Sequence, residues 1–177
     1  MKYAKMLVAM MLLVVFTLAA QTPQYIGADK CKMCHMSKAK GEQFGIWQGS
    51  KHSQAYTVLT TEQAKAVAQK AGQGGEPPED NPACLKCHVA GWDAPAAMLG
   101  PKYVKAEGVT CESCHGPGED YSPMKIMQDK DLSIQNGMVL GNKETCVKCH
   151  NSESPTYKPF NYDTFWPKIE HKIPKTQ

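Results

Sequence analysis

The chain has 177 residues and a formal net charge of +3, and all 20 of its basic residues are lysine. This length suits a single domain. Without arginine, the chain lacks the bidentate side chain that most often recognises bases and phosphates, so we do not expect nucleic acid as a partner.

The first twenty residues have the pattern of an export signal. Lys2 and Lys5 precede an apolar run over 6–16, and small residues follow up to Ala20. This pattern predicts a cleaved signal peptide over 1–20 and a mature domain over 21–177 in the periplasm, with an extracellular location as an alternative. The other alternative is an uncleaved anchor, but the run is shorter than the roughly 20 residues of a membrane-spanning helix. We therefore expect no membrane association after cleavage.

All eight cysteines lie in four C-x-x-C pairs, and a histidine directly follows each pair. In chain order these are Cys31, Cys34 and His35; Cys84, Cys87 and His88; Cys111, Cys114 and His115; and Cys146, Cys149 and His150. C-x-x-C-H is the attachment signature of c-type haem: the two thiols bond to the porphyrin and the histidine ligates the iron. The sequence thus predicts four covalently attached haem c groups, numbered 1 to 4 here in chain order.

Two other interpretations of the cysteine pairs remain open. Two C-x-x-C pairs together can bind zinc through four thiolates, although an oxidising compartment disfavours free thiolates. A disulfide within each pair would close a very small, strained ring of the redox-active kind. We favour haem attachment because each of the four pairs is followed by histidine.

Four haems leave little polypeptide for an ordinary apolar core. The mature chain would provide about 39 residues for each haem, too few for a conventional interior. We therefore expect a mainly α fold with long loops, in which the haems form the core. The four motifs begin 53, 27 and 35 residues apart, so no regular repeat generates them and the mature chain is expected to fold as one unit.

Two segments outside the motifs are predicted to be helical or partly helical. A helix after the first motif is expected to break near Gly41 or Gly45 and to resume through His52. The aromatic C-terminal segment predicts a short helix that ends near Pro174.

The segment "TTEQAKAVAQKAG" is the clearest predicted helix. Thr60 and Gln63 suit a capping box, and Gly72 is expected to end the helix. Its expected apolar face consists of Ala64, Val67, Ala68 and Ala71. The following stretch, 72–82, is rich in Gly and Pro and predicts a surface loop.

The number of axial ligands limits how the irons are bound. Four irons have eight axial positions, but the chain has only six histidines. Because His52 and His171 are the only histidines outside the motifs, we expect both to be distal ligands. Among the methionines, Met127 and then Met124 are the best candidates for a sulfur ligand, although packing is the alternative role for both.

Three stretches together resemble the tetrahaem cytochrome c-554 family. They are "GADKCKMCHMSKAKGEQFGIWQGSKHSQAY", "CLKCHVAGW" and "GVTCESCHGPG". The resemblance implies a mainly helical multihaem c-type cytochrome with closely packed haem pairs that serves as a periplasmic electron carrier.

The resemblance also implies a set of axial ligands. His52 would ligate haem 3 opposite His115, and His171 would ligate haem 4 opposite His150. Haem 2, bound by His88, would have no distal protein ligand. The family supplies the distal ligand of haem 1 from a histidine after the third motif, but this chain has none there. Haem 1 would therefore take Met127 or Met124, or stay open opposite His35.

We favour an electron carrier over an enzyme. Its partners would be redox proteins, a donor and an acceptor, with docking assisted by lysines near the motifs. One alternative is a reductase or oxidase that binds a small ligand such as nitric oxide, nitrite or hydroxylamine at an open haem 2. Another is a subunit of a cytochrome filament, which the small number of histidines disfavours.

Overall fold

The computed structural model describes residues 22–172, so the predicted signal peptide and Pro174 lie outside the described residues. Helices joined by long loops make up the fold, and the expectation of a mainly α protein is confirmed. The only β interaction within residues 22–172 is an isolated parallel bridge between Tyr25 and Leu99. None of the helices between residues 22 and 172 has the length and apolar character needed to cross a bilayer.

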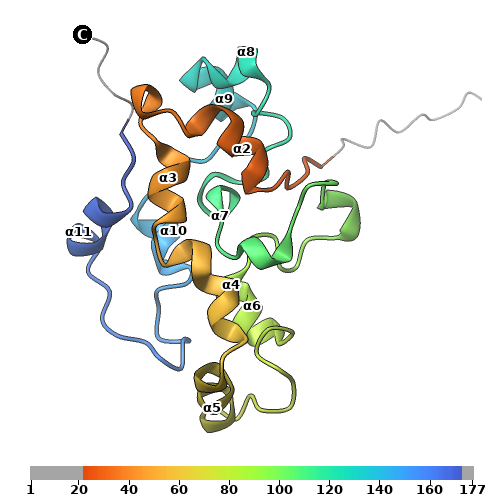
Figure 1. Ribbon diagram of the computed structural model, residues 1–177, viewed down its shortest axis with the longest axis vertical. Helices are drawn as coiled ribbons and strands as arrows, with labels where there is room; N and C mark the ends of the chain where they lie inside the picture. The colour runs from red at the N-terminus through yellow and green to blue at the C-terminus, as the bar shows by residue number, and fades with distance from the viewer. Residues whose placement is uncertain (1–21, 173–177) are drawn as a thin grey trace, which may run out of the picture.

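The helices are short. The α-helices are α2 Ala28–His35, α3 Gln43–Gln48, α4 Ala55–Leu59, α5 Glu62–Lys70, α6 Pro82–His88, α7 Cys111–His115, α8 Met124–Met127, α9 Lys130–Gln135, α10 Lys143–Val147 and α11 Tyr162–Phe165. The 3₁₀ helices are η1 Lys38–Lys40, η2 His52–Gln54, η3 Ala96–Met98, η4 Lys105–Glu107 and η5 Trp166–Lys168. In Figure 1, α7 lies near the middle of the molecule, α8 and α9 lie at one end of its long axis, and α5 lies at the other.

The apolar core formed by the polypeptide is small. Its buried cluster consists of Leu59, Leu85 and Val89, with Tyr56 and Cys84 packed against it. This cluster joins α4 to α6, which are in contact. So few buried side chains would not stabilise a chain of this length by themselves.

Large apolar side chains around the cysteine motifs are exposed instead of buried. Met33 exposes 74% of its surface, and the others are Met36, Val139, Leu140 and Val147. A flat apolar group attached at each motif would cover such side chains and remove their surface from water. The polypeptide is thus shaped as expected for a protein whose interior includes porphyrins.

The helix predicted after Thr60 is present, but its cap is one residue further on. Thr61, not Thr60, is the N-cap of α5, and its hydroxyl accepts a hydrogen bond from the N–H of Ala64. Gly72 follows the end of the helix with φ +72°, as predicted for a C-terminal stop. Of the predicted apolar face, Ala64, Val67 and Ala68 are at least partly buried and Ala71 is exposed.

The helical region after the first motif breaks at Gly41, one of the two alternatives expected. Gly41 has φ +103° and ends η1, whereas Gly45 lies inside α3. A Cβ at position 45 would lie 2.9 Å from Cγ of Glu42. Glycine at this position therefore leaves room for the Glu42 side chain. In the aromatic C-terminal segment, η5 directly follows α11 and ends at Lys168. The helical region thus ends before the expected position near Pro174.

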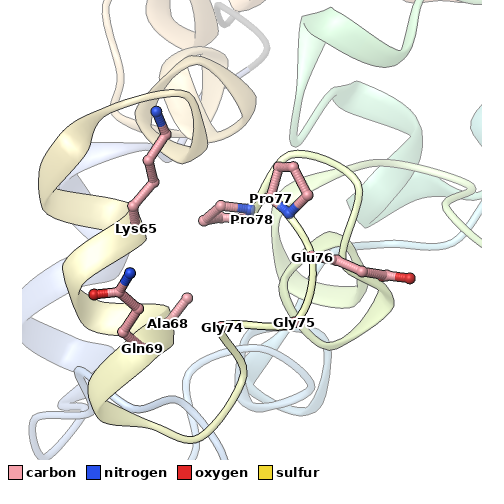
Figure 2. A pocket seen from close by; sticks show the side chains of 8 residues that line it. All are labelled: Lys65, Ala68, Gln69, Gly74, Gly75, Glu76, Pro77 and Pro78. Carbon is pink, nitrogen blue, oxygen red and sulfur yellow. The ribbon is translucent and has the colours of Figure 1, made fainter.

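The Gly- and Pro-rich stretch 72–82 is largely a loop, as predicted, with α6 beginning at Pro82. Together with α5 it encloses a shallow cavity of about 260 Å³, shown in Figure 2. Its lining consists of backbone, two prolines and the stems of polar side chains, and it contains no residue of a cysteine motif. We regard it as a packing gap of the scaffold.

Candidate haem-binding site

Each cysteine motif lies on a short helix or begins on one. The first three motifs end α2, α6 and α7, and the fourth begins in α10. Three of these helices have an N-cap residue whose side chain accepts a backbone hydrogen bond. Asn81, Thr110 and Asn142 accept from N–H groups of α6, α7 and α10, respectively. A helical turn places the two cysteines of a pair and the following histidine on neighbouring positions, as attachment to one porphyrin requires.

Within residues 22–172, the eight thiols are neither paired in disulfides nor gathered into metal-binding groups. All eight are free, so no disulfide joins any pair. Within residues 22–172, no three His, Cys, Asp or Glu side chains gather closely enough to hold a metal ion by themselves. Residues 22–172 therefore contain no four-thiolate group of the kind that binds zinc.

Thiols from different motifs are close enough to affect each other's ionisation in three places. These pairs are Cys31 with Cys111, Cys114 with Cys146, and Cys87 with Cys149. The first pair joins motifs 1 and 3, the second joins 3 and 4, and the third joins 4 and 2. The motifs are thus arranged in space in the order 1, 3, 4, 2, which differs from their order in the sequence.

The same proximities affect thiol ionisation. Hydrogen bonding between Cys31 and Cys111 raises the pKa of Cys31 and lowers that of Cys111. Burial raises the pKa of Cys114 to about 11, with Cys146 adding to the rise. Burial and the nearby Cys87 raise the pKa of Cys149 to about 12.

Three of the four motif histidines are oriented through Nδ1. This atom lies 3.1 Å from Oε1 of Gln43 in His35, 2.6 Å from the carbonyl oxygen of Ala55 in His88, and 2.7 Å from that of Val139 in His115. An Nδ1–H that donates to such an oxygen leaves Nε2 as a lone-pair donor, which is the usual arrangement of a metal-ligating histidine.

Two pairs of imidazole rings face each other. The ring centres of His52 and His150 are 6.0 Å apart, and those of His115 and His171 are 5.9 Å apart. Two imidazoles that ligate one iron from opposite sides, with metal–nitrogen bonds of about 2 Å, place their ring centres roughly 6 Å apart. Both pairs therefore fit axial ligation of a haem iron.

The pairing differs from the one that the family resemblance implied. His52 faces His150 of motif 4, not His115, and His171 faces His115 of motif 3, not His150. His171 is only 21 residues from His150 in the sequence, but the intervening segment passes His150 before it reaches His115. The ring contacts thus pair these histidines differently from the expectation, and the ligand of each iron stays a prediction.

The position of His52 is fixed from the side of the third motif. The indole N–H of Trp47 donates to the carbonyl oxygen of Val109 over 2.7 Å, and the N–H of Val109 donates to the carbonyl oxygen of His52 over 3.3 Å. Gly108, with φ +74°, allows this approach, because a Cβ there would lie 3.0 Å from the backbone nitrogen of Tyr56.

Burial lowers the pKa of three of these histidines and so favours their neutral form. Desolvation lowers the pKa of His52, His115 and His150 below the ordinary value. The facing imidazole lowers the pKa further for His52, where it is His150, and for His115, where it is His171. A neutral imidazole is the form that binds a metal.

His35 and His88 have no facing imidazole among the described residues. Of the methionines expected near haem 1, Met127 is half-buried on α8, whereas Met124 exposes 66% of its surface. Neither sulfur forms a hydrogen bond with a motif histidine within residues 22–172. Burial therefore favours Met127 over Met124, without bringing either into contact with His35.

His150 is oriented by stacking. Its ring lies on Phe160 with centres 4.7 Å apart and planes at 15°, and Phe160 in turn stacks on Phe165 at 5.6 Å. Among the described residues, neither ring nitrogen of His150 forms a hydrogen bond, in contrast to the other motif histidines. Sequence analysis noted the aromatic character of this segment but did not assign Phe160 to the site.

The sequence is similar to known haem proteins. Residues 30–116, which hold the first three motifs, match the family model described as "Cytochrome c554 and c-prime". Cytochrome c-554 of Nitrosomonas europaea is 30% identical over 182 residues, a match that covers 88% of this chain and 71% of that protein. No solved structure is significantly similar. The chain therefore belongs to the cytochrome c-554 family of haem-containing electron-transfer proteins.

Proposed function

We propose that this protein carries four covalently attached haem c groups and passes electrons between redox partners outside the cytoplasm. The observation that supports this most strongly is the proximity of thiols of successive motifs in the order 1, 3, 4, 2. Groups attached at neighbouring thiols lie within a short tunnelling distance of one another. This order would form one continuous electron path from motif 1 to motif 2.

The ring pairs suggest which residues ligate each iron. His115 and His171 would hold haem 3, and His150 and His52 would hold haem 4. His35 would hold haem 1 with Met127 as the distal ligand, and His88 would hold haem 2 alone.

The protein side of the function follows from these residues. The haem supplies reversible one-electron chemistry at iron. The cysteines would fix the position of each haem. The hydrogen bonds that Nδ1–H donates in His35, His88 and His115 orient the imidazole planes and increase the basicity of the ligating nitrogen. The four sites share one scaffold but differ in distal ligand and in these hydrogen bonds, so their potentials should differ.

Docking of redox partners is proposed near motif 1. Lys86 and Lys172 already form salt bridges with Glu153 and Glu170. The lysines around the first motif are exposed and would attract an acidic partner at low ionic strength: Lys30, Lys32, Lys38 and Lys40.

Two measurements test the proposal. Reductive titration of the purified protein should consume four electrons per polypeptide, and electron paramagnetic resonance (EPR) of the oxidised protein should count two low-spin bis-histidine irons and one high-spin iron. A haem 1 with methionine adds a third low-spin iron. Uptake of fewer than four electrons would contradict the proposal.

A reductase activity at haem 2 is the second candidate. Nδ1 of His88 lies 2.6 Å from the carbonyl oxygen of Ala55. His88 is also the motif histidine for which no imidazole or methionine is proposed on the opposite side of the iron. Two tyrosine hydroxyls already donate hydrogen bonds to the backbone and are not free to supply protons: that of Tyr103 donates to the carbonyl oxygen of Ala90 and that of Tyr121 to the carbonyl oxygen of Gly116. Carbon monoxide binding to one ferrous haem, with steady turnover of nitrite or hydroxylamine, would favour this candidate.

A further inference from the structure

Glu112 is a buried acid inside the third cysteine motif. It is the residue after Cys111, and only 3% of its surface is exposed. Acidic side chains are rarely buried to this extent unless the surrounding groups stabilise the charge. The ligation proposed above gives Glu112 no role.

The partners of Glu112 are backbone N–H donors. One carboxylate oxygen accepts from Ile26 over 2.8 Å and from Gly118 over 2.7 Å, and the other accepts from Gly27 over 2.9 Å. Ile26 and Gly27 lead directly into α2, which carries motif 1. Glu112 therefore joins the start of motif 1 to motif 3.

This arrangement fits a carboxylate. All three contacts supply protons to the oxygens, and such bonds stabilise the charged form. Burial raises the pKa of Glu112 above its ordinary value, and the three backbone bonds counteract that rise. A second carboxylate, that of Glu107, is half-buried nearby and accepts from the N–H of Ala28 over 2.9 Å.

Both acids act on the same pair of attachment sites. The charges of Glu112 and Glu107 each affect the thiols of Cys31 and Cys111, which attach haems 1 and 3. Glu112 directly follows Cys111, and the backbone N–H groups that the two acids bind, those of Ile26, Gly27 and Ala28, lie at the start of the helix that carries Cys31. The two carboxylates therefore lie beside the attachment sites of haems 1 and 3.

We propose that Glu112, assisted by Glu107, is a positioning residue that holds haems 1 and 3 together and lowers the reduction potentials of these two haems only. A ferric haem core carries one positive charge more than a ferrous one, so a fixed negative charge in a poorly screened site favours the ferric state. The inference rests on the four-haem proposal.

The test is a potentiometric titration of the purified holoprotein. Replacing Glu112→Gln keeps the shape and removes the charge, so two of the four potentials should rise and the other two should stay in place. Variants that lack Cys31 and Cys34, or Cys111 and Cys114, identify the two haems. Glu112→Asp, which keeps the charge, should retain potentials near those of the native protein.

Glu119→Gln is the matched control. Glu119 also binds the N-terminal segment, because it accepts from the N–H of Gln24 over 2.8 Å, but it is exposed. It should leave all four potentials unchanged. Equal shifts in Glu119→Gln and Glu112→Gln, or no shift in Glu112→Gln with four haems still bound, would overturn the inference. If the Glu112→Gln protein does not accumulate, Glu107→Gln must raise the potentials of haems 1 and 3. Unchanged potentials in the Glu107→Gln protein would equally overturn the inference. A haem count in every variant separates these outcomes from a failure of the four-haem proposal.

Discussion

The ring of His52 faces the ring of His150, with centres 6.0 Å apart and planes at 62°. The two residues are separated by 98 positions in the chain, and the backbone of His52 is bound to Val109 just before motif 3. His52 therefore sits on the scaffold of one motif and presents its imidazole to another. This relationship links the two central motifs of the proposed electron path.

Replacing His52→Ala should remove the distal ligand of haem 4. One of the four irons should convert from a low-spin to a high-spin EPR signal, because a single imidazole leaves the iron five-coordinate. In a protein that lacks haem 4 through Cys146→Ala and Cys149→Ala, the same replacement should add no further high-spin iron. A further conversion in that background would show that His52 ligates haem 3 after all.

Met127→Ala should change haem 1 alone. Loss of a thioether ligand removes its preference for ferrous iron, so the potential of haem 1 should fall and the methionine-to-iron band in near-infrared magnetic circular dichroism should disappear. Met124→Ala is the control, since this side chain is largely exposed, and the band should persist. If the native protein shows no such band, haem 1 has no methionine ligand.

Phe160→Leu should loosen the imidazole of His150. Leucine preserves apolar contact but removes the stacking at 4.7 Å, which should destabilise the protein by about 1 kcal/mol. The EPR g values of haem 4 should shift, because they depend on the angle between its two imidazole planes. Tyr157→Leu is the control at an exposed aromatic residue of the same segment, and it should leave those g values unchanged.

Two glycines with nearly equal φ should respond differently to alanine. Gly108 has φ +74° and backbone atoms close to the missing Cβ, whereas Gly72 has φ +72° and nothing within 4 Å. Gly72→Ala should cost about 1 kcal/mol for the left-handed backbone alone. Gly108→Ala should cost about 3 kcal/mol, because its backbone (φ +74°, ψ −131°) is one that residues with a side chain rarely adopt and because the segment that carries His52 must also move. Chemical unfolding measures both, and equal losses would contradict the packing described around Gly108.

Features that depend on neighbouring residues could be predicted from the sequence, whereas contacts between distant segments could not. The motifs, the helix before Gly72 and the loop over 72–82 depend on neighbouring residues, so spacing and composition predicted them. The ring contacts of His52 and His171 depend on how the chain crosses itself, so local sequence does not predict them. The burial of Glu112 left no local signal either, because its three hydrogen-bond donors come from segments 6 to 86 residues away.

The central claim is that four haems are bound covalently and form the interior of this protein. Intact-mass spectrometry of the purified protein under denaturing conditions tests it most directly. The expected result is the mass of the polypeptide plus four haem groups, with all eight thiols resistant to alkylation. A mass that corresponds to fewer haems, or alkylation of any motif cysteine, would contradict the claim.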